Sequence, residues 1–340
     1  MPTDHPRVLH VTECAGGGVP RAIRDLAACT PELEHHVLWP VANGVDGFAS
    51  ARAWPGHSPA VTGVLRSAVG ELRPDLVHLH SSWAGVYGRL RPLGVPVVYQ
   101  PHGFRFERPG VLAAATRPVE RLLARRSAAL VALSPHEHRL ATALAPAGMP
   151  VPVLPNIASV RPSLAGGDRT GPPLVVMAGR VCAQKDPDYL IEVATAARAT
   201  VPELRFRWLG GGEPAAEARL ADAGIEVSGW LDAGALADAL AEADLYLHTA
   251  RYEGFPLSVL DAVATGLPVL ARDIPALHGS GLPLAGDPGQ AAEAVVRALT
   301  DPAELDRARA RAAALAARHT TQALHDAALT LYTPILENLR

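Results

Sequence analysis

The chain has 340 residues, of which 49% are hydrophobic, and a formal net charge of -3. This length is typical of two domains, and the charge balance lacks the basic patch or tail that nucleic-acid binding requires. Three cysteines without a CxxC pair argue against a disulfide framework or a zinc site, and they predict a cytoplasmic protein. We find no signal peptide and no apolar run of the roughly 18 residues that a membrane span needs.

Short β-branched runs alternate along the chain with helical stretches that are rich in Ala, Leu and Arg. Near-continuous apolar runs between helices predict parallel sheets that are covered on both faces. The predicted strands of the first half are residues 7–12, 35–41, 76–81, 95–100 and 129–134. Those of the second half are residues 173–179, 204–211, 225–230, 245–250 and 267–272. Two series of five strands predict an α/β protein with two doubly wound domains.

A segment that is rich in Gly and Pro separates the two series. Residues 161–173 contain few large apolar side chains, so we predict an interdomain linker there. The predicted domains are therefore residues 1–160 and 161–319. Beyond about residue 288 the chain is predicted to be helical, with each of two Asp-Pro pairs (Asp287-Pro288 and Asp301-Pro302) starting a helix.

Three glycines, Gly16, Gly17 and Gly18, follow the first predicted strand. Glycines at this position let the backbone approach a ligand closely, and the next helix N-terminus favours an anion. The dinucleotide fingerprint GxGxxG would need a glycine where Arg21 stands, and no acid closes the second strand, so a nicotinamide site is disfavoured. The alternative interpretation is a plain tight turn.

His102 lies just beyond the fourth predicted strand and directly before a glycine. Ligands of open α/β sheets bind at the carboxyl ends of the strands, so this side chain can point at a ligand. A lone histidine can also be structural, and this alternative stays open.

Arg180 and Lys185 lie in one loop after the first strand of the second half. Two cations beside a helix N-terminus predict a diphosphate site, and a solvated basic loop is the alternative. The sequence Asp-Pro-Asp at residues 186–188 superficially matches a metal-binding DxD motif. We interpret Asp186 as a helix N-cap and Pro187 as the first helical residue, and we assign no metal ligand.

Glu253 and Asp261 lie on either side of a predicted helix start, within the sequence RYEGFPLSVLDAVATG. Pro256 suits the first turn of a helix that runs to about Thr265, and Gly254 allows a close turn before it. Two acids at different points along one ligand suit a sugar or a ribose, because carboxylates accept hydrogen bonds from hydroxyl groups. Nothing indicates the paired carboxylates of a glycosidase.

The segments GGGVPR, PHGF, GRVCAQKD and EGFPLSVLDAVATGLPVL occur in this order along the chain. Together they resemble the retaining, nucleotide-sugar-dependent glycosyltransferases of glycosyltransferase family 4. The resemblance covers nearly the whole chain and implies a GT-B fold, in which two Rossmann-like domains face each other across the active-site cleft. The first domain would bind the acceptor and the second the donor. A last helix at residues 320–340 would pack back on the first domain.

The resemblance also implies roles for particular residues. Arg180 and Lys185 would bind the donor diphosphate, and His102 would approach the transferred sugar. Glu253 would contact the donor sugar, together with the backbone of Gly254, Phe255, Pro256 and Leu257. Asp261 stands where the family has a Glu that binds the ribose, and it is one methylene shorter.

Two further elements complete the implied binding site. Gly17 and Gly18 would lie near the phosphates or the acceptor. Trp230 belongs to the segment that would frame the base. His102, Glu253, Arg180 and Lys185 are the predicted catalytic residues.

The implied reaction retains the anomeric configuration and needs no metal, because Arg180 and Lys185 stabilise the leaving diphosphate. UDP or GDP is the expected nucleotide, and a glycan, a lipid-linked sugar or a small natural product is the expected acceptor. A non-hydrolysing nucleotide-sugar epimerase and an inactive scaffold protein are the alternatives.

Arg117, Arg121 and Arg125 recur every four residues along one predicted helix face. Such a stripe can bind anionic lipid, which would bring the protein to the inner face of the membrane and to a lipid-linked acceptor. An ordinary solvated helix face is the simpler interpretation.

Overall fold

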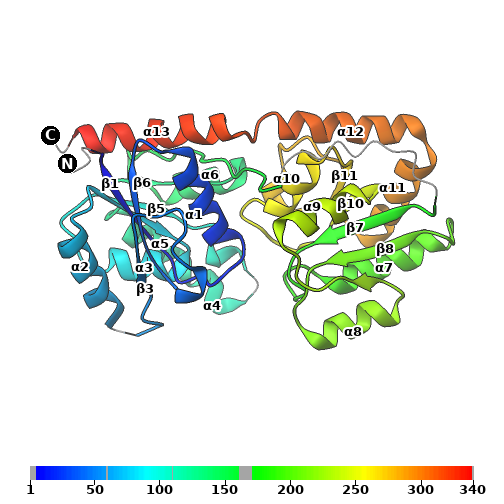
Figure 1. Ribbon diagram of the computed structural model, residues 1–340, viewed down its shortest axis with the longest axis horizontal. Helices are drawn as coiled ribbons and strands as arrows, with labels where there is room; N and C mark the ends of the chain where they lie inside the picture. Colours follow the sequence, from blue (N-terminus) through cyan, green and yellow to red (C-terminus); the bar gives the residue numbers. More distant parts are fainter. Residues whose placement is uncertain (1–4, 59, 109, 161–170, 339–340) are drawn as a thin grey trace. The chain divides into compact units, whose positions relative to one another are not determined.

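The computed structural model describes residues 5–58, 60–108, 110–160 and 171–338. The chain divides into two compact units (Figure 1). Unit 1 comprises Met1–Asn156 and Thr321–Arg340, and unit 2 comprises Ile157–Thr320. The predicted domain boundary, after residue 160, falls slightly later. Most of the predicted linker, residues 161–170, lies outside the described residues.

Unit 1 contains a six-stranded sheet in the order β3-β2-β1-β4-β5-β6, in which every neighbouring pair is parallel. Its strands are β1 (Arg7–Val11), β2 (Glu34–Trp39), β3 (Ser50–Ala53), β4 (Leu76–His80), β5 (Val97–Gln100) and β6 (Ala129–Leu130). Its helices are α1 (Gly18–Cys29), η1 (Val41–Asn43), α2 (Ala60–Leu72), α3 (Ser82–Arg89), η2 (Arg105–Glu107), α4 (Val111–Ala114), α5 (Thr116–Ala124), α6 (Pro135–Leu144) and α13 (Thr321–Glu337).

Unit 2 also contains a six-stranded parallel sheet, in the order β12-β11-β10-β7-β8-β9. Its strands are β7 (Leu174–Ala178), β8 (Arg205–Leu209), β9 (Glu226–Val227), β10 (Leu245–His248), β11 (Val269–Arg272) and β12 (Leu284–Ala285). Its helices are α7 (Pro187–Arg198), α8 (Pro214–Asp222), α9 (Ala233–Ala241), α10 (Leu257–Ala264), η3 (Pro275–Leu277), α11 (Pro288–Thr300) and α12 (Pro302–Ala316).

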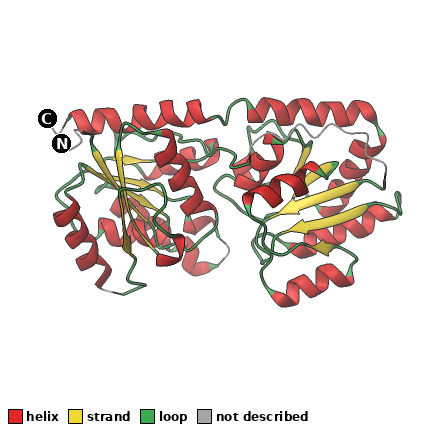
Figure 2. Ribbon diagram, in the orientation of Figure 1, coloured by secondary structure: helices red, strands yellow, loops and turns green. Residues whose placement is uncertain are grey.

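Each of the ten predicted runs overlaps a strand, and the two parallel sheets are confirmed. Within each unit, helices flank the strands (Figure 2). The edge strands β3 and β12 were not predicted, because they are short and neither is a continuous β-branched run. The helix starts at Asp287 and Asp301 are confirmed: each carboxylate accepts a backbone N–H of the first turn. None of the described helices is both long and apolar enough to span a bilayer.

The two sheets have the same topology. Counted from the first strand of each unit, both have the order 3-2-1-4-5-6. The chain therefore reverses its direction of winding between β1 and β4 in unit 1, and between β7 and β10 in unit 2. Ligands of doubly wound sheets bind beyond the carboxyl ends of the strands at this point.

Side chains of the unit 1 strands alternate between two different surroundings. Leu9, Val77 and Leu79 face a hydrophobic core. The residues between them, including His10 and His78, face the opposite side of the sheet. His78 there contacts Tyr332 of α13. One face of this sheet is thus apolar, and the other carries buried polar side chains.

Helix α3 lies unusually close to the unit 1 sheet. A Cβ added to Gly85 would stand 2.2 Å from Cε2 of Tyr99, and one added to Gly88 would stand 2.5 Å from Cδ1 of Leu79. Both distances are too short for any side chain, so glycine is needed at both positions.

This close packing encloses Arg89 at the end of α3, whose side chain is 0% exposed. Its guanidinium donates a 2.7 Å hydrogen bond to Oε2 of Glu120 and lies 3.6 Å from the ring centre of Tyr99. The Tyr99 hydroxyl donates to Oε1 of the same carboxylate at 3.2 Å. Glu120 therefore compensates a buried charge and a buried hydroxyl at once.

Substituting Glu120→Leu should destabilise unit 1 by about 3–5 kcal/mol, because it leaves Arg89 buried without a counter-charge. The double substitution Arg89→Met with Glu120→Leu should recover part of this loss, since it removes both charges. Urea unfolding followed by circular dichroism measures both effects. Glu71→Leu, which breaks the exposed pair with Arg52, is the matched control and should change stability little. A double variant that is less stable than Glu120→Leu would contradict this account.

Candidate active site

In unit 2, the loops after β7 and β10 meet at the point where the winding reverses. Gly179 opens the first loop with φ of 145°, and a Cβ there would lie 3.1 Å from Cε of Lys185. Glycine therefore leaves room for the lysine side chain to pass. The second loop is held against the first, because the Arg251 N–H donates to the Gln184 carbonyl at 2.9 Å.

Lys185 and Glu253 form an ion pair across these two loops. Their side chains are 16% and 13% exposed. The Thr249 hydroxyl donates to the Lys185 carbonyl at 2.6 Å, so the lysine is held at its backbone as well as at its ammonium group. Lys185 is the only lysine in the sequence. All the other residues counted as Lys or Arg are arginines. An ammonium group is a compact point charge, which a planar guanidinium does not reproduce.

His248 lies beneath this ion pair at the end of β10. Its side chain is fully buried, and its Nε2 stands 3.9 Å from Oε1 of Glu253. That nitrogen has no hydrogen-bond partner among the described residues. Burial, and then the charge of Lys185, lower the pKa of His248 well below its usual value, so the ring is neutral. The Lys185–Glu253 ion pair therefore lies next to a neutral, buried imidazole ring.

Arg180 comes from the same loop as Lys185. Its side chain is exposed, and no ion pair or hydrogen bond holds it within the described part of the chain. The loop thus presents one fixed cation, Lys185, and one unrestrained cation, Arg180, and the diphosphate site expected there stays a prediction.

Asp186 is the N-cap residue of α7 and Pro187 begins the helix, both as predicted, but the Asp186 side chain does not cap it. Asp186 adopts a left-handed conformation with φ of 54°, and its carboxylate makes no cap hydrogen bond. The carboxylate instead accepts hydrogen bonds from Arg251 at 2.8 and 2.9 Å and from Arg272 at 2.6 Å. Burial alone would raise the pKa of Asp186, but the two arginines outweigh burial and lower it. Asp188 is exposed and pairs with Arg219.

Residues 254–257 lead into α10 as predicted, with a shift of one position. Pro256 is the N-cap rather than the first helical residue, which is Leu257. No side chain caps this helix, and its first turn carries no acid. Gly254, Phe255 and Pro256 are buried. The uncapped first turn of α10 therefore begins four residues after Glu253.

Asp261 lies one turn into α10 and is 1% exposed. Its Oδ1 accepts hydrogen bonds from the Ser159 N–H at 2.9 Å and from the Ser159 hydroxyl at 3.3 Å. These bonds to Ser159 hold Oδ1 of Asp261, whose other implied contact is with the donor ribose. That ribose contact stays a prediction.

Trp230 is 67% exposed, which is unusual for so large an apolar side chain. Its ring lies next to Gly211, where an added Cβ would stand 3.4 Å from Trp230 Cδ1. The segment after β9 therefore presents a flat aromatic surface beside the glycine-rich end of β8.

In unit 1 the glycine loop begins α1. Gly17 is the N-cap with φ of 77°, Gly18 is the first helical residue, and α1 has no side-chain cap and no acid in its first turn. Asn43 stabilises the loop, because its Oδ1 accepts the Gly16 N–H at 2.8 Å and its amide donates to the Cys14 carbonyl at 2.9 Å. Nothing in the sequence pointed to Asn43.

His102 follows β5 with φ of 53°, a strained conformation for a residue other than glycine. Its ring is half-buried, and its Nε2 is 3.0 Å from Nδ1 of His80. Burial lowers the pKa of His102 to about 3, so the ring is neutral near pH 7. The next residue, Gly103, donates its N–H to Oε1 of Glu137 at 2.6 Å. Glu137 therefore positions the His102 loop, and it was not predicted, although Ser134 and Glu137 have the spacing of a capping box.

Two family models match the chain, one in each unit. Residues 17–157 match the model described as "Glycosyl transferase 4-like domain", and residues 172–301 match "Glycosyl transferases group 1". The chain is a GT-B glycosyltransferase.

Two relatives of this glycosyltransferase are named transferases as well. The enzyme is 26% identical to an alpha-D-kanosaminyltransferase of Streptomyces kanamyceticus, over 96% of this chain and 97% of that one. It is 27% identical to the Escherichia coli UDP-Gal:alpha-D-GlcNAc-diphosphoundecaprenol alpha-1,3-galactosyltransferase, over 59% of this chain and 58% of that one. Its fold matches Anabaena HepE in complex with UDP-glucose, with a TM-score of 0.80 at 18% identity, over 97% of this chain and all of that one.

The pH dependence of stability should report on Glu137 of this glycosyltransferase. Burial raises the pKa of Glu137 to about 7 from its ordinary value of 4.5, although backbone N–H groups of Gly103 and Leu133 oppose the rise. A pKa that is higher in the folded state means that the unfolded state releases its proton first. The contribution of Glu137 to stability is therefore present below about pH 4.5 and falls as pH rises through 7, by about 3 kcal/mol in total.

Glu137→Gln is neutral at every pH and should lack this slope. Urea unfolding of both proteins between about pH 5 and pH 8 measures the difference. Equal slopes in the two proteins would show that Glu137 does not titrate in this range.

Proposed function

We propose that this enzyme is a retaining glycosyltransferase of family 4, which transfers a sugar from a UDP-sugar to a hydroxyl acceptor without a metal ion. The observation that carries the proposal is the Lys185–Glu253 ion pair at the winding reversal of unit 2. One loop supplies a cation for a diphosphate, and the other supplies a carboxylate for sugar hydroxyls. Both precede a helix N-terminus.

Each part of a nucleotide-sugar has a matching group in unit 2. Arg180 and Lys185 would bind the two phosphates, aided by the free N–H groups of α10. Glu253 would accept hydrogen bonds from the sugar. The exposed ring of Trp230 would stack on the base. UDP is preferred over GDP because relatives carry UDP-Gal in their name or UDP-glucose in their structure.

Transfer breaks the bond between the anomeric carbon and the β-phosphate oxygen, and the electron pair leaves with UDP. The acceptor oxygen bonds to the anomeric carbon on the same face, and its proton passes to the departing phosphate. Arg180 and Lys185 stabilise the charge that develops on that phosphate. Glu253 is already paired with Lys185, so we assign it to sugar binding and not to nucleophilic attack.

The alternatives are less well supported. An epimerase would need acid and base groups that exchange a proton with the sugar, whereas both matched family models describe glycosyl transferases. An inactive scaffold would not need the only lysine of the chain at the winding reversal.

Helix α5 supports an acceptor that is presented at a membrane surface. Arg117, Arg121 and Arg125 are exposed, as predicted for the basic stripe. Val119 and Leu122, on the same helix, are 47% and 64% exposed. Exposed apolar side chains beside cations suit a bilayer interface with anionic lipid. We therefore favour a lipid-linked glycan over a small natural product, and the Escherichia coli relative has a diphosphoundecaprenol substrate in its name.

Calorimetric titration with UDP, GDP and ADP tests the donor site. UDP should bind without Mg²⁺, and Lys185→Ala should weaken binding roughly 10- to 100-fold, because a charge-assisted contact is lost. Lys185→Arg is the matched control that keeps the charge and changes its shape. Failure of all three nucleotides to bind, or binding only with Mg²⁺, would refute the proposed donor site. The anomeric proton coupling in the product of a UDP-sugar then tests retention.

Cosedimentation with vesicles tests the α5 surface. The protein should bind vesicles that contain anionic lipid, and Arg117→Ser/Arg121→Ser/Arg125→Ser should bind several-fold less. The matched control removes three exposed arginines of α12 instead: Arg307→Ser/Arg309→Ser/Arg311→Ser. Equal losses in the two triple variants, or no binding by the parent protein, would favour a small soluble acceptor.

A further inference from the structure

Four histidines from four neighbouring positions in the unit 1 sheet form one chain of hydrogen bonds. The chain begins at His35 on β2, passes through His10 on β1 and His80 on β4, and ends at His102 after β5. The ring nitrogens are 3.0 Å apart between His35 and His10, 3.1 Å between His10 and His80, and 3.0 Å between His80 and His102. This series of hydrogen bonds passes from β1 to β4, which is where the winding of the sheet reverses.

The inner end of this chain fixes its direction. Nε2 of His35 faces the hydroxyl oxygen of Thr30 at 3.0 Å and the carbonyl oxygen of Thr30 at 3.1 Å. The Thr30 hydroxyl donates its own hydrogen to the Leu26 carbonyl at 2.8 Å. Both Thr30 atoms can therefore only accept from His35, so Nε2 of His35 carries the hydrogen.

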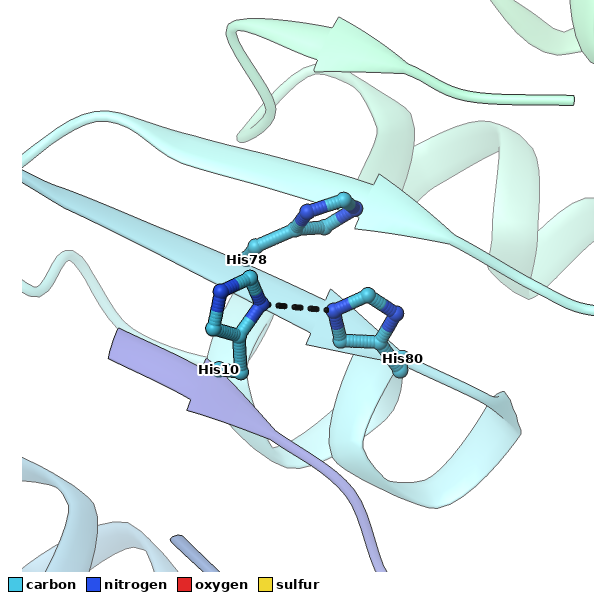
Figure 3. Close-up of side chains that lie close together, drawn as sticks. All are labelled: His10, His78 and His80. Carbon is cyan, nitrogen blue, oxygen red and sulfur yellow. Dashed lines mark hydrogen bonds between the residues drawn. The ribbon is translucent and has the colours of Figure 1, made fainter. Parts of the chain in front are cut away.

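The remaining tautomers follow in sequence. A neutral imidazole has one donor and one acceptor nitrogen. Because Nδ1 of His35 must accept, Nε2 of His10 donates. Nδ1 of His10 then accepts from Nε2 of His80; the dashed line in Figure 3 joins these two rings. Nδ1 of His80 finally accepts from Nε2 of His102. Burial lowers the pKa of all four histidines, which keeps them neutral.

We infer that His35, His10 and His80 are positioning residues that hold His102 as the Nε2–H tautomer, so that its Nδ1 accepts a hydrogen bond from a substrate hydroxyl. Nδ1 of His102 has no protein partner among the described residues, and the two nitrogens of an imidazole point in divergent directions. The inference rests on the proposed function for its substrate, whereas the tautomer itself follows from unit 1 alone.

Backbone strain marks the same place. Ser81, which directly follows His80, has a φ of 73°. His102 itself has a φ of 53°. Conformations of this kind are costly for residues other than glycine, and they persist where the surroundings hold them. Ser81 is held by Glu13, to which its hydroxyl donates at 2.5 Å, and the His102 loop is held by Glu137. Both ends of the His80–His102 contact are therefore fixed.

His78 lies beside the hydrogen-bonded histidines. The alternative is that His10, His78 and His80 bind a metal ion. Nitrogens of His10, His78 and His80 lie within 4.8 Å of one another (Figure 3). However, the rings of His78 and His80 lie against each other, tilted, with centres 4.0 Å apart and planes 33° apart. Three imidazoles around one ion, each about 2.0–2.1 Å from it, would fan apart instead. Nδ1 of His78 is also 2.7 Å from the Tyr332 hydroxyl. The hydrogen-bonded chain fits these rings better.

The test is imidazole nitrogen NMR of the full-length protein labelled with ¹⁵N-histidine, without substrate. His102 should be neutral with its proton on Nε2 near pH 7. Protonation on Nδ1, a cationic His102, or a stoichiometric metal ion shown by elemental analysis would each overturn the inference. Absence of nucleotide binding or turnover would instead count against the proposed function, and it would leave the tautomer result unaffected.

Variants of His35, the hydrogen-bonded histidine farthest from His102, test the link between the two residues. His35→Phe removes the acceptor of His10, so His102 should become a mixture of tautomers and kcat/KM should fall roughly tenfold. His35→Gln can donate to Thr30 and accept from His10, so it should restore both. His36→Phe is the matched control, because His36 lies on the same strand but outside the chain and bonds Ser50 at 2.8 Å. If His35→Phe does not fold, the tautomer in the parent protein still decides. A scrambled tautomer with unchanged kcat/KM would overturn the positioning role.

Discussion

One buried carboxylate, that of Asp186, holds together three loops of unit 2. It accepts hydrogen bonds from Arg251 after β10 and from Arg272 at the end of β11, while its own backbone begins the helix after β7. Two guanidinium groups outweigh the cost of burial and keep the carboxylate charged. Lys185 directly precedes Asp186, so the direction of the lysine toward Glu253 depends on this contact. The charges that would meet the donor are thereby set in place before any ligand arrives.

Unit 1 solves the same problem with other acceptors. Asn43 accepts an N–H of the glycine loop, and Glu137 accepts one from the loop of His102. Glu13 accepts the N–H groups of Trp83 and Ala84 at the start of α3. Loops beyond a parallel sheet have no neighbouring strand to satisfy their backbone N–H groups, so side-chain oxygens accept these hydrogen bonds instead. These hydrogen bonds fix the loops in place, and a binding site needs such rigidity.

The two sheets could be predicted from the sequence, because buried parallel strands are continuous apolar runs. The placing of Arg180, Lys185 and Glu253 followed from the rule that ligands meet the carboxyl ends of strands. The role of Asp186 could not be predicted, since an Asp-Pro pair looks the same whether the carboxylate caps the helix or pairs with distant arginines. The hydrogen-bonded histidines could not be predicted for a related reason. The alternation of side chains along a strand puts His78 and His80 on one face of the sheet, but only the strand order brings His35 and His10 beside them.

The scarcity of lysine has a practical consequence for chemical labelling. Apart from the amino terminus, a reagent that modifies amines has a single target in this chain, Lys185. That amine is partly shielded by Glu253, and a ligand bound beside it would change its reactivity. Reductive methylation with a ¹³C reagent would therefore introduce one spectroscopic probe at the centre of unit 2. An amine-reactive nucleotide analogue would likewise form one internal adduct, whose position is known in advance.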